Sequence, residues 1–172
     1  YYLTPEERRL ITRTTVKAAR GRVPVIASGH TSDTVSGSVR ELSAMAEEGA
    51  DAVIVISNHF CRSGEGDEIW LENCEKVLSQ LDPAIDMGIY ECPHPYKRLL
   101  SPQVLKYLAD TGRFYFMKDT CCDADEIRRR LDILKGTSFG LYNANSATLL
   151  ETLQAGAAGF SGVMANMHPE LY

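Results

Sequence analysis

A single lysine stands at the end of an apolar and aromatic stretch, "FYFMKD", which reads as a buried strand ending at Lys118 and Asp119. Burial disfavours the charged form of an amine, so a lysine in this position can become partly neutral and attack a carbonyl carbon to form a Schiff base. An ion pair with Asp119, or a surface amine whose stem lies along apolar atoms, would also explain the position. The position by itself does not choose between these arrangements.

A tyrosine, Tyr90, ends another apolar stretch, "AIDMGIYECP". Its phenol could lie beside the lysine amine and transfer protons, or it could be an aromatic that fills the interior with its hydroxyl in water. Glu91 and Cys92 follow directly. Because side chains alternate along a strand, one of these two is expected to point toward the covering helices, and we assign no role to either.

Further polar residues follow the other predicted strands, and we expect His59, Asn143 and Ser161 to contact the rest of a substrate. All four histidines fall in such loops: His30, His59, His94 and His168. They lack HxH or HxxxH spacing and the carboxylates are scattered, so no metal site is predicted.

Strand-like and helix-like segments alternate along the chain. The first helix is expected to start at Thr4, with Pro5 in its first turn and Glu7 placed for a capping box, and to end at Gly21. Six apolar strand segments follow, each separated from the next by a helix: 22–29, 51–58, 84–93, 113–119, 138–144 and 157–166. Their continuous hydrophobicity is typical of parallel strands that are covered on both faces.

This alternation predicts an α/β fold, either a doubly wound sheet or a β/α barrel. No GxGxxG or P-loop motif supports the nucleotide-binding sheet. A complete (β/α)8 TIM barrel takes about 250 residues. We therefore predict a single domain over residues 1–172 that is an incomplete barrel of about six β/α units, without the first strands and the C-terminal helices.

Composition narrows the classes of partner. Hydrophobic residues make up 44% of the chain, charged residues 24%, and the net charge is −5. No apolar run reaches the ~20 residues that span a bilayer, and no basic block suggests nucleic acid, so we expect neither a membrane nor a nucleic-acid partner. Five cysteines without CxxC spacing favour free thiols and a cytoplasmic location.

Five segments resemble one family in order and spacing: "GRVPVIASGHTS", "EEGADAVIVIS", "GIYECP", "FMKDTCCD" and "LQAGAAGFSGVMAN". They are similar to the dihydrodipicolinate synthase and N-acetylneuraminate lyase family, the pyruvate-type class I aldolases built on a β/α barrel. The resemblance implies that Lys118 forms the imine, that Tyr90 relays protons, that no cofactor is needed, and that the protein is a homotetramer.

The chain also differs from the family pattern. The loop that holds the substrate carboxylate belongs before Tyr1, Pro95 stands where the synthases have an arginine for their second substrate, and His59 and Phe60 replace a tyrosine pair. A polar, uncharged lining suits a hydroxylated sugar-acid chain. We therefore predict a lyase or aldolase that cleaves or condenses a 2-oxo acid. The alternatives are a dehydratase of a deoxy sugar acid, dihydrodipicolinate synthase itself, and a non-catalytic ligand-binding barrel.

Overall fold

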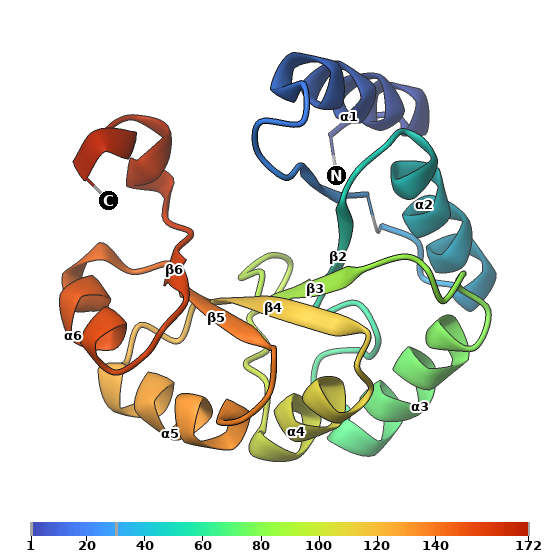
Figure 1. Cartoon of the computed structure of the whole chain (residues 1–172). Coiled ribbons are helices and arrows are strands. Elements are labelled where there is room, and N and C mark those ends of the chain that lie inside the picture. Colours follow the sequence, from blue (N-terminus) through green and yellow to red (C-terminus); the bar gives the residue numbers. More distant parts are fainter. Residues whose placement is uncertain (1, 30, 172) are drawn as a thin grey trace. The chain divides into compact units, whose positions relative to one another are not determined.

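Helices and strands alternate in the computed structural model, which describes residues 2–29 and 31–171 (Figure 1). His30, one of the histidines considered above, lies outside the described residues. The strands are β1 Ile26–Ser28, β2 Ala52–Ile56, β3 Met87–Tyr90, β4 Phe114–Asp119, β5 Gly140–Asn143 and β6 Gly159–Phe160. The helices are α1 Pro5–Ala19, α2 Val35–Glu47, α3 Asp67–Leu78, α4 Pro102–Asp110, α5 Ala124–Leu134 and α6 Leu149–Gln154. The described residues also form three short 3-10 helices: η1 Ser146–Thr148, η2 Val163–Asn166 and η3 Pro169–Leu171.

The molecule divides into two compact units, residues 1–88 and 89–172. In the first unit β1 runs parallel to β2, with Ile26 opposite Ala52, and the Val53 N–H donates to Asp86 O (2.9 Å) just before β3. In the second unit β4, β5 and β6 are neighbours in that order and parallel. That the six strand–helix repeats form a single domain stays a prediction.

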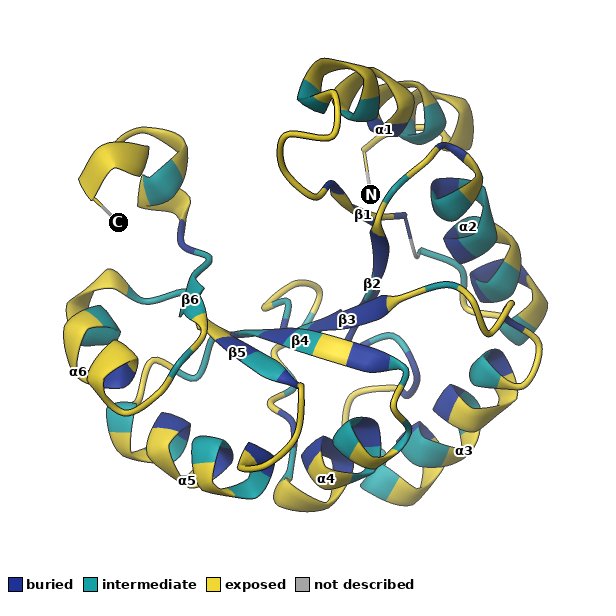
Figure 2. Cartoon of the chain, viewed as in Figure 1, coloured by how far each residue is buried: buried dark blue, intermediate teal, exposed yellow. Residues whose placement is uncertain are grey.

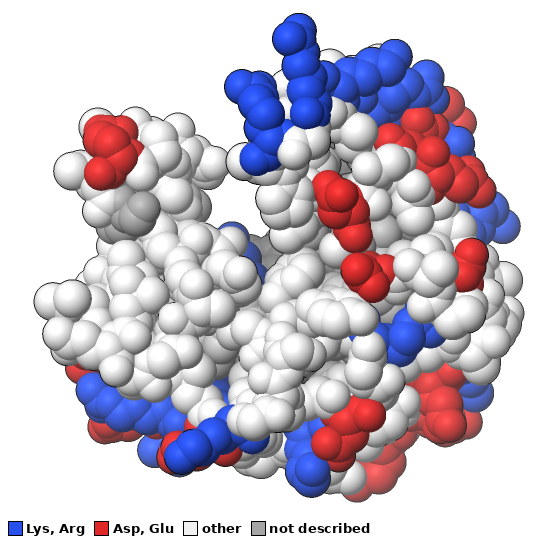
Figure 3. All heavy atoms as spheres, viewed as in Figure 1, with Lys and Arg blue, Asp and Glu red and all other residues white. Residues whose placement is uncertain are grey.

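The first helix begins as predicted. The Thr4 hydroxyl accepts from the Glu7 N–H (3.2 Å), and the Glu7 carboxylate accepts from the Thr4 N–H (2.8 Å), which completes the capping box. Helix α1 is joined to α2 by Glu48, a buried carboxylate that accepts from Arg9 (2.7 Å) and Arg13 (2.6 Å). The bonds from Arg13 and Arg9 lower the pKa of Glu48 to about 2, against its burial. Figure 3 shows Lys and Arg side chains next to Asp and Glu side chains over α1 and α2.

The last predicted strand is shorter than expected. Only Gly159–Phe160 pair with β5, because β5 itself ends at Asn143, opposite Phe160. The Ser161 N–H still donates to Asn143 O (2.8 Å), but the following backbone finds partners within itself, since the Ala165 N–H donates to Gly162 O (3.2 Å). The second half of the predicted segment therefore forms η2.

Buried and less buried residues follow one another along β4 and β5 in the second unit (Figure 2). On one face of β4 and β5 the residues are buried: Met117, Asp119, Leu141 and Asn143. Lys118 lies on the other face and is only partly covered. Figure 1 shows α4 and α5 along one side of β4 and β5, and their apolar faces are completely buried at Leu105, Leu108 and Ile127. None of the described helices is both long and apolar enough to cross a membrane.

Candidate active site

Lys118 and Tyr90 lie against each other within the second unit. The Lys118 Nζ is 4.8 Å from the centre of the Tyr90 ring, and both side chains are partly buried. The two strand ends that carry them are joined by a backbone hydrogen bond, from the Glu91 N–H to Lys118 O (3.2 Å). The structure therefore brings together the two residues that the sequence singled out.

The surroundings of this pair change the acidity of both groups. Burial lowers the pKa of the Lys118 amine, and the charge of Cys92 opposes this in part. Burial also raises the pKa of the Tyr90 phenol, as do the charge of Cys92 and a side-chain hydrogen bond with it. A lowered lysine pKa increases the share of neutral amine, which is the nucleophilic form, while a raised tyrosine pKa keeps the phenol protonated and able to donate.

An ion pair between Lys118 and Asp119 is not formed. The Asp119 carboxylate lies on the opposite face of the sheet, where it is completely buried and pairs with Arg130. Its other oxygen accepts from the Cys121 N–H (2.8 Å). The pairing with Arg130 leaves the lysine amine beside the phenol instead of beside a carboxylate.

The residue after Tyr90 also points away from the lysine. Glu91 is completely buried, and it accepts from the Leu100 N–H (2.8 Å) and the Thr120 N–H (3.1 Å). Its carboxylate pairs with the Arg130 guanidinium at 2.8 Å. Burial raises the pKa of Glu91 and Arg130 opposes the rise, while the neighbouring charge of Asp119 adds to it. Of the two residues after Tyr90, Glu91 therefore faces the helices and Cys92 contacts the phenol.

Tyr142 belongs to the lysine's face of the sheet, and the sequence reasoning did not select it. It lies directly opposite Lys118 in the parallel pairing of β4 and β5 and meets the Phe116 ring edge-on, at 6.3 Å between ring centres. Gly159 lies opposite Tyr142 on the other side, where an added Cβ would come within 3.0 Å of the tyrosine ring. The register that aligns Tyr142 with Lys118 comes from strand pairing, so only the period-two alternation could have hinted at it.

The three predicted substrate contacts have different surroundings. His59 belongs to the first unit, where its N–H donates to Ile56 O (3.1 Å). Ser161 follows β6 in the second unit and is partly exposed.

Asn143 is completely buried, on the face opposite Lys118. Its amide nitrogen donates to Thr148 and Thr152 (both 3.0 Å), and its oxygen accepts from the Asn145 N–H (2.7 Å). These bonds hold the turn that leads into α6. Substrate contact by any of the three residues stays a prediction.

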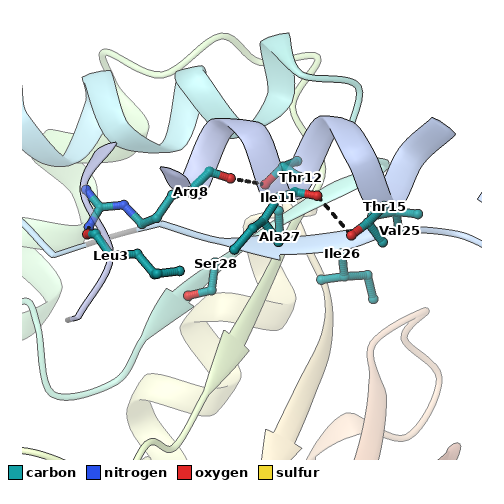
Figure 4. Close-up of a pocket in the computed structure, with 9 residues that line it drawn as sticks. All are labelled: Leu3, Arg8, Ile11, Thr12, Thr15, Val25, Ile26, Ala27 and Ser28. Atoms are coloured by element: carbon teal, nitrogen blue, oxygen red, sulfur yellow. Dashed lines mark hydrogen bonds between the residues drawn. The ribbon is translucent and has the colours of Figure 1, made fainter. Parts of the chain in front are cut away.

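Other parts of the described structure give less support for a catalytic site. Within residues 2–29 and 31–171, no three His, Cys, Asp or Glu side chains gather in a way that could hold a metal ion. A pocket in the first unit lies between α1 and β1 (Figure 4). Its lining is mostly apolar, and its one charged side chain, Arg8, is already paired with Glu41 (3.3 Å).

The repeated parallel β/α units and a half-buried lysine at a strand end define a chain of the β/α-barrel class with a candidate imine-forming site. The model of the "Dihydrodipicolinate synthetase family" matches residues 1–172, so the chain belongs to that family.

Among curated relatives, the chain is 28% identical over 171 residues to a 4-hydroxy-tetrahydrodipicolinate synthase of Clostridium perfringens, covering 98% of this chain and 56% of the relative. Among solved structures, it superposes on the pyruvate-complexed, chloride-inhibited dihydrodipicolinate synthase of Acinetobacter baumannii with a TM-score of 0.85 and 22% identity, over 98% and 56% of the two chains. The synthase of Aquifex aeolicus gives a TM-score of 0.81 at 24% identity, with the same coverage. The likeness confirms the predicted partial β/α barrel, and the chain spans little more than half the length of these relatives.

Proposed function

We propose that the protein is a Schiff-base-forming lyase or aldolase that acts on a 2-oxo acid through Lys118. The observation that carries this proposal is the placement of the Lys118 amine, half-buried and 4.8 Å from the centre of the Tyr90 ring. Family membership supports it, as does the Acinetobacter baumannii relative, whose structure is described as a complex with pyruvate.

The reaction starts with the neutral amine of Lys118. Its lone pair attacks the keto carbon of the substrate, and the resulting carbinolamine loses water to give a protonated imine. The β-hydroxyl then loses its proton and the bond between the α and β carbons breaks. The imine accepts the electron pair of this bond, which gives an enamine and a carbonyl product. In the condensing direction, the enamine attacks an aldehyde instead. In the cleavage direction, protonation of the enamine carbon restores the imine. Hydrolysis of the imine by water then releases the 2-oxo acid and restores the amine.

Tyr90 supplies the proton transfers that these steps need. Its phenol donates to the oxygen that leaves the carbinolamine as water, and the phenolate then takes a proton from the next intermediate. The raised pKa of Tyr90 keeps the phenol in its donor form before each cycle.

The substrate is proposed to be a sugar-derived 2-oxo acid. Around Lys118 the second unit offers the Tyr90 and Tyr142 phenols and the Cys92 side chain, and hydroxyl groups of a sugar-acid chain can hydrogen-bond to them. We propose Ser161 as a further contact, whereas contact by His59, which belongs to the first unit, stays a prediction. For Asn143, its hydrogen bonds to Thr148 and Thr152 favour a role in holding the turn before α6.

Product analysis distinguishes the proposed cleavage from two related reactions, and a Lys118→Ala variant distinguishes the enzyme from a binding protein. Release of pyruvate marks cleavage, whereas loss of water from a deoxy sugar acid marks a dehydratase that uses the same imine. Turnover of aspartate semialdehyde with pyruvate marks the synthase reaction that the Clostridium perfringens relative is named for. A binding protein would keep its ligand affinity and its biological role after Lys118→Ala. A homotetrameric, cytoplasmic enzyme without a cofactor stays part of the proposal.

The first experiment traps the imine. The full-length protein is incubated with pyruvate, and separately with a library of sugar-derived 2-oxo acids, then reduced with borohydride and mapped by peptide mass spectrometry. We expect an adduct on Lys118 that is lost in Lys118→Ala and kept in Lys106→Ala. Lys106 is a suitable control because its side chain is 69% exposed and paired with Asp110. An adduct on neither lysine with every acid tested, or equal labelling of both, would refute the proposal.

A further inference from the structure

A buried charge cluster lies behind the two strand ends that carry the lysine and the tyrosine. It consists of Glu91, Asp119 and Arg130, whose side chains are at most 2% exposed. One guanidinium nitrogen, Nη1, contacts both carboxylates, Glu91 at 2.8 Å and Asp119 more closely still. The second terminal nitrogen donates to Leu100 O (3.2 Å), and Nε donates to Glu126 (3.2 Å).

The members of the cluster are the chain neighbours of the proposed catalytic residues. Glu91 follows Tyr90, and Asp119 follows Lys118. Because successive side chains of a strand point to opposite faces, holding Glu91 and Asp119 on the helix side directs Tyr90 and Lys118 to the other side. Arg130, from α5, holds both acids at once and so fixes the two strand ends relative to each other.

A second set of bonds joins the same two strand ends. The Thr120 N–H donates to the Glu91 carboxylate (3.1 Å), and the Thr120 hydroxyl donates to Glu91 O (2.7 Å). The loop after β4 is thereby tied to the loop after β3, and Arg130 pairs with the same Glu91 carboxylate.

Stability alone is a poor reason to keep such a cluster. Taking three charges out of water is costly, and apolar residues of similar volume often stabilise a core equally well or better. A buried guanidinium fork differs from apolar packing in fixing the distance and orientation of the groups that it bridges. The benefit of the cluster is therefore expected in the geometry of the neighbouring site.

We propose that Arg130 is a positioning residue, which sets the Tyr90–Lys118 contact by bridging Glu91 and Asp119. The inference rests on the proposed role of Lys118. The contact geometry that the inference explains is independent of that role. Arg130 touches neither the amine nor the phenol in the contacts described above, so it acts through the two acids.

The test compares the full-length protein with its Arg130→Lys variant, which keeps the buried cation but loses the fork. Arg129→Lys is the matched control, because Arg129 is the preceding residue of α5, is 64% exposed and also pairs with Glu126. Trace acetylation of the lysines across a pH range, read by peptide mass spectrometry, reports the pKa and reactivity of Lys118 without any substrate. Exposed Lys106 provides the internal standard.

We expect Arg130→Lys to raise the pKa of Lys118 toward the ordinary lysine value, because a loosened strand end lets water reach the amine. Borohydride trapping with a 2-oxo acid should slow about tenfold or more, since small displacements of reacting groups are costly. Arg129→Lys should change neither quantity.

Unchanged Lys118 acetylation and trapping in folded Arg130→Lys would overturn the proposal. If wild-type protein traps no 2-oxo acid, the proposed function fails, and the acetylation profile alone then decides the positioning role. If Arg130→Lys does not fold, Glu91→Gln is tested in the same way. It weakens the bridge from the opposite side while keeping an acceptor for a backbone N–H, and an unchanged Lys118 profile there is equally decisive.

Discussion

Replacing Arg130 by methionine is the perturbation for which the structure predicts the largest change in stability. Methionine keeps much of the side-chain volume but removes the guanidinium, which contacts Glu91, Asp119 and Leu100 O. Both carboxylates are completely buried and would remain without their cation. The variant therefore isolates the cost of uncompensated buried charge from the cost of an empty cavity.

The magnitude follows from the number of charges that lose their partner. Removing one member of a buried ion pair costs about 3–5 kcal/mol, because the other charge stays buried. Arg130 serves two carboxylates, so we expect about 4–5 kcal/mol at neutral pH, near the upper end of that range. A domain is stable by only about 5–15 kcal/mol, so the variant should be folded but marginal. Arg129→Met removes an exposed ion pair of the same helix and should cost about 0–1 kcal/mol.

The stability that Arg130→Met loses should depend on pH in a defined direction. Burial already raises the pKa of Glu91 above its ordinary value of 4.5, and Arg130 opposes that rise. Without Arg130 the pKa of Glu91 in the folded state rises further above its pKa in the unfolded state. The stability that Glu91 contributes at low pH is therefore lost as the pH increases through the folded-state pKa. The difference between variant and wild type should thus be largest near about pH 8 and smaller near about pH 5.

Urea unfolding at these two pH values, followed by circular dichroism of the full-length proteins, measures both effects. Arg129→Met is measured beside Arg130→Met under the same conditions. If the two variants lose the same stability, Arg130 does not compensate the buried acids. A loss that stays constant or grows as the pH falls would show that removing Arg130 does not raise the folded-state pKa of Glu91, and would refute the electrostatic reasoning.

Three further predictions concern single contacts. Tyr90→Phe keeps the ring beside Lys118 but removes the phenol, so borohydride trapping should persist while turnover falls about 10²–10⁴-fold; wild-type turnover would exclude the proton relay. Trp70→Phe removes the indole N–H that donates to Ser57 O (2.7 Å) in the first unit and should cost about 1–3 kcal/mol by urea unfolding, whereas an unchanged midpoint and slope would show that this bond adds nothing. Thr4→Ala removes the N-cap of α1 and should cost about 1 kcal/mol, with the amides of the first turn exchanging faster by hydrogen–deuterium exchange; an unchanged rate would contradict the role of the cap.

Much of the architecture was predictable because local sequence decides it. Continuous apolar runs gave the strands, and the Thr4 cap gave the start of α1. The position of Lys118 at the end of an apolar strand made imine chemistry one of several explanations, since an amine there loses hydration, and the family resemblance favoured it. The end of the last strand was not predictable, because it depends on where β5 stops at Asn143.

The amino-acid sequence by itself determined which residues stand near the ends of the first five strands, because hydrophobic periodicity is a local property. Only the tertiary structure decided which of them share a face and which face the helices. Asn143 and Tyr142 are adjacent in sequence, yet the parallel register places Tyr142 opposite Lys118 and buries Asn143 on the other side. The sequence did not predict the contacts of Arg130 for the same reason. Its partners lie 39 and 11 residues away along the chain, and packing of α5 against the sheet, rather than any sequence pattern, brings their charges together.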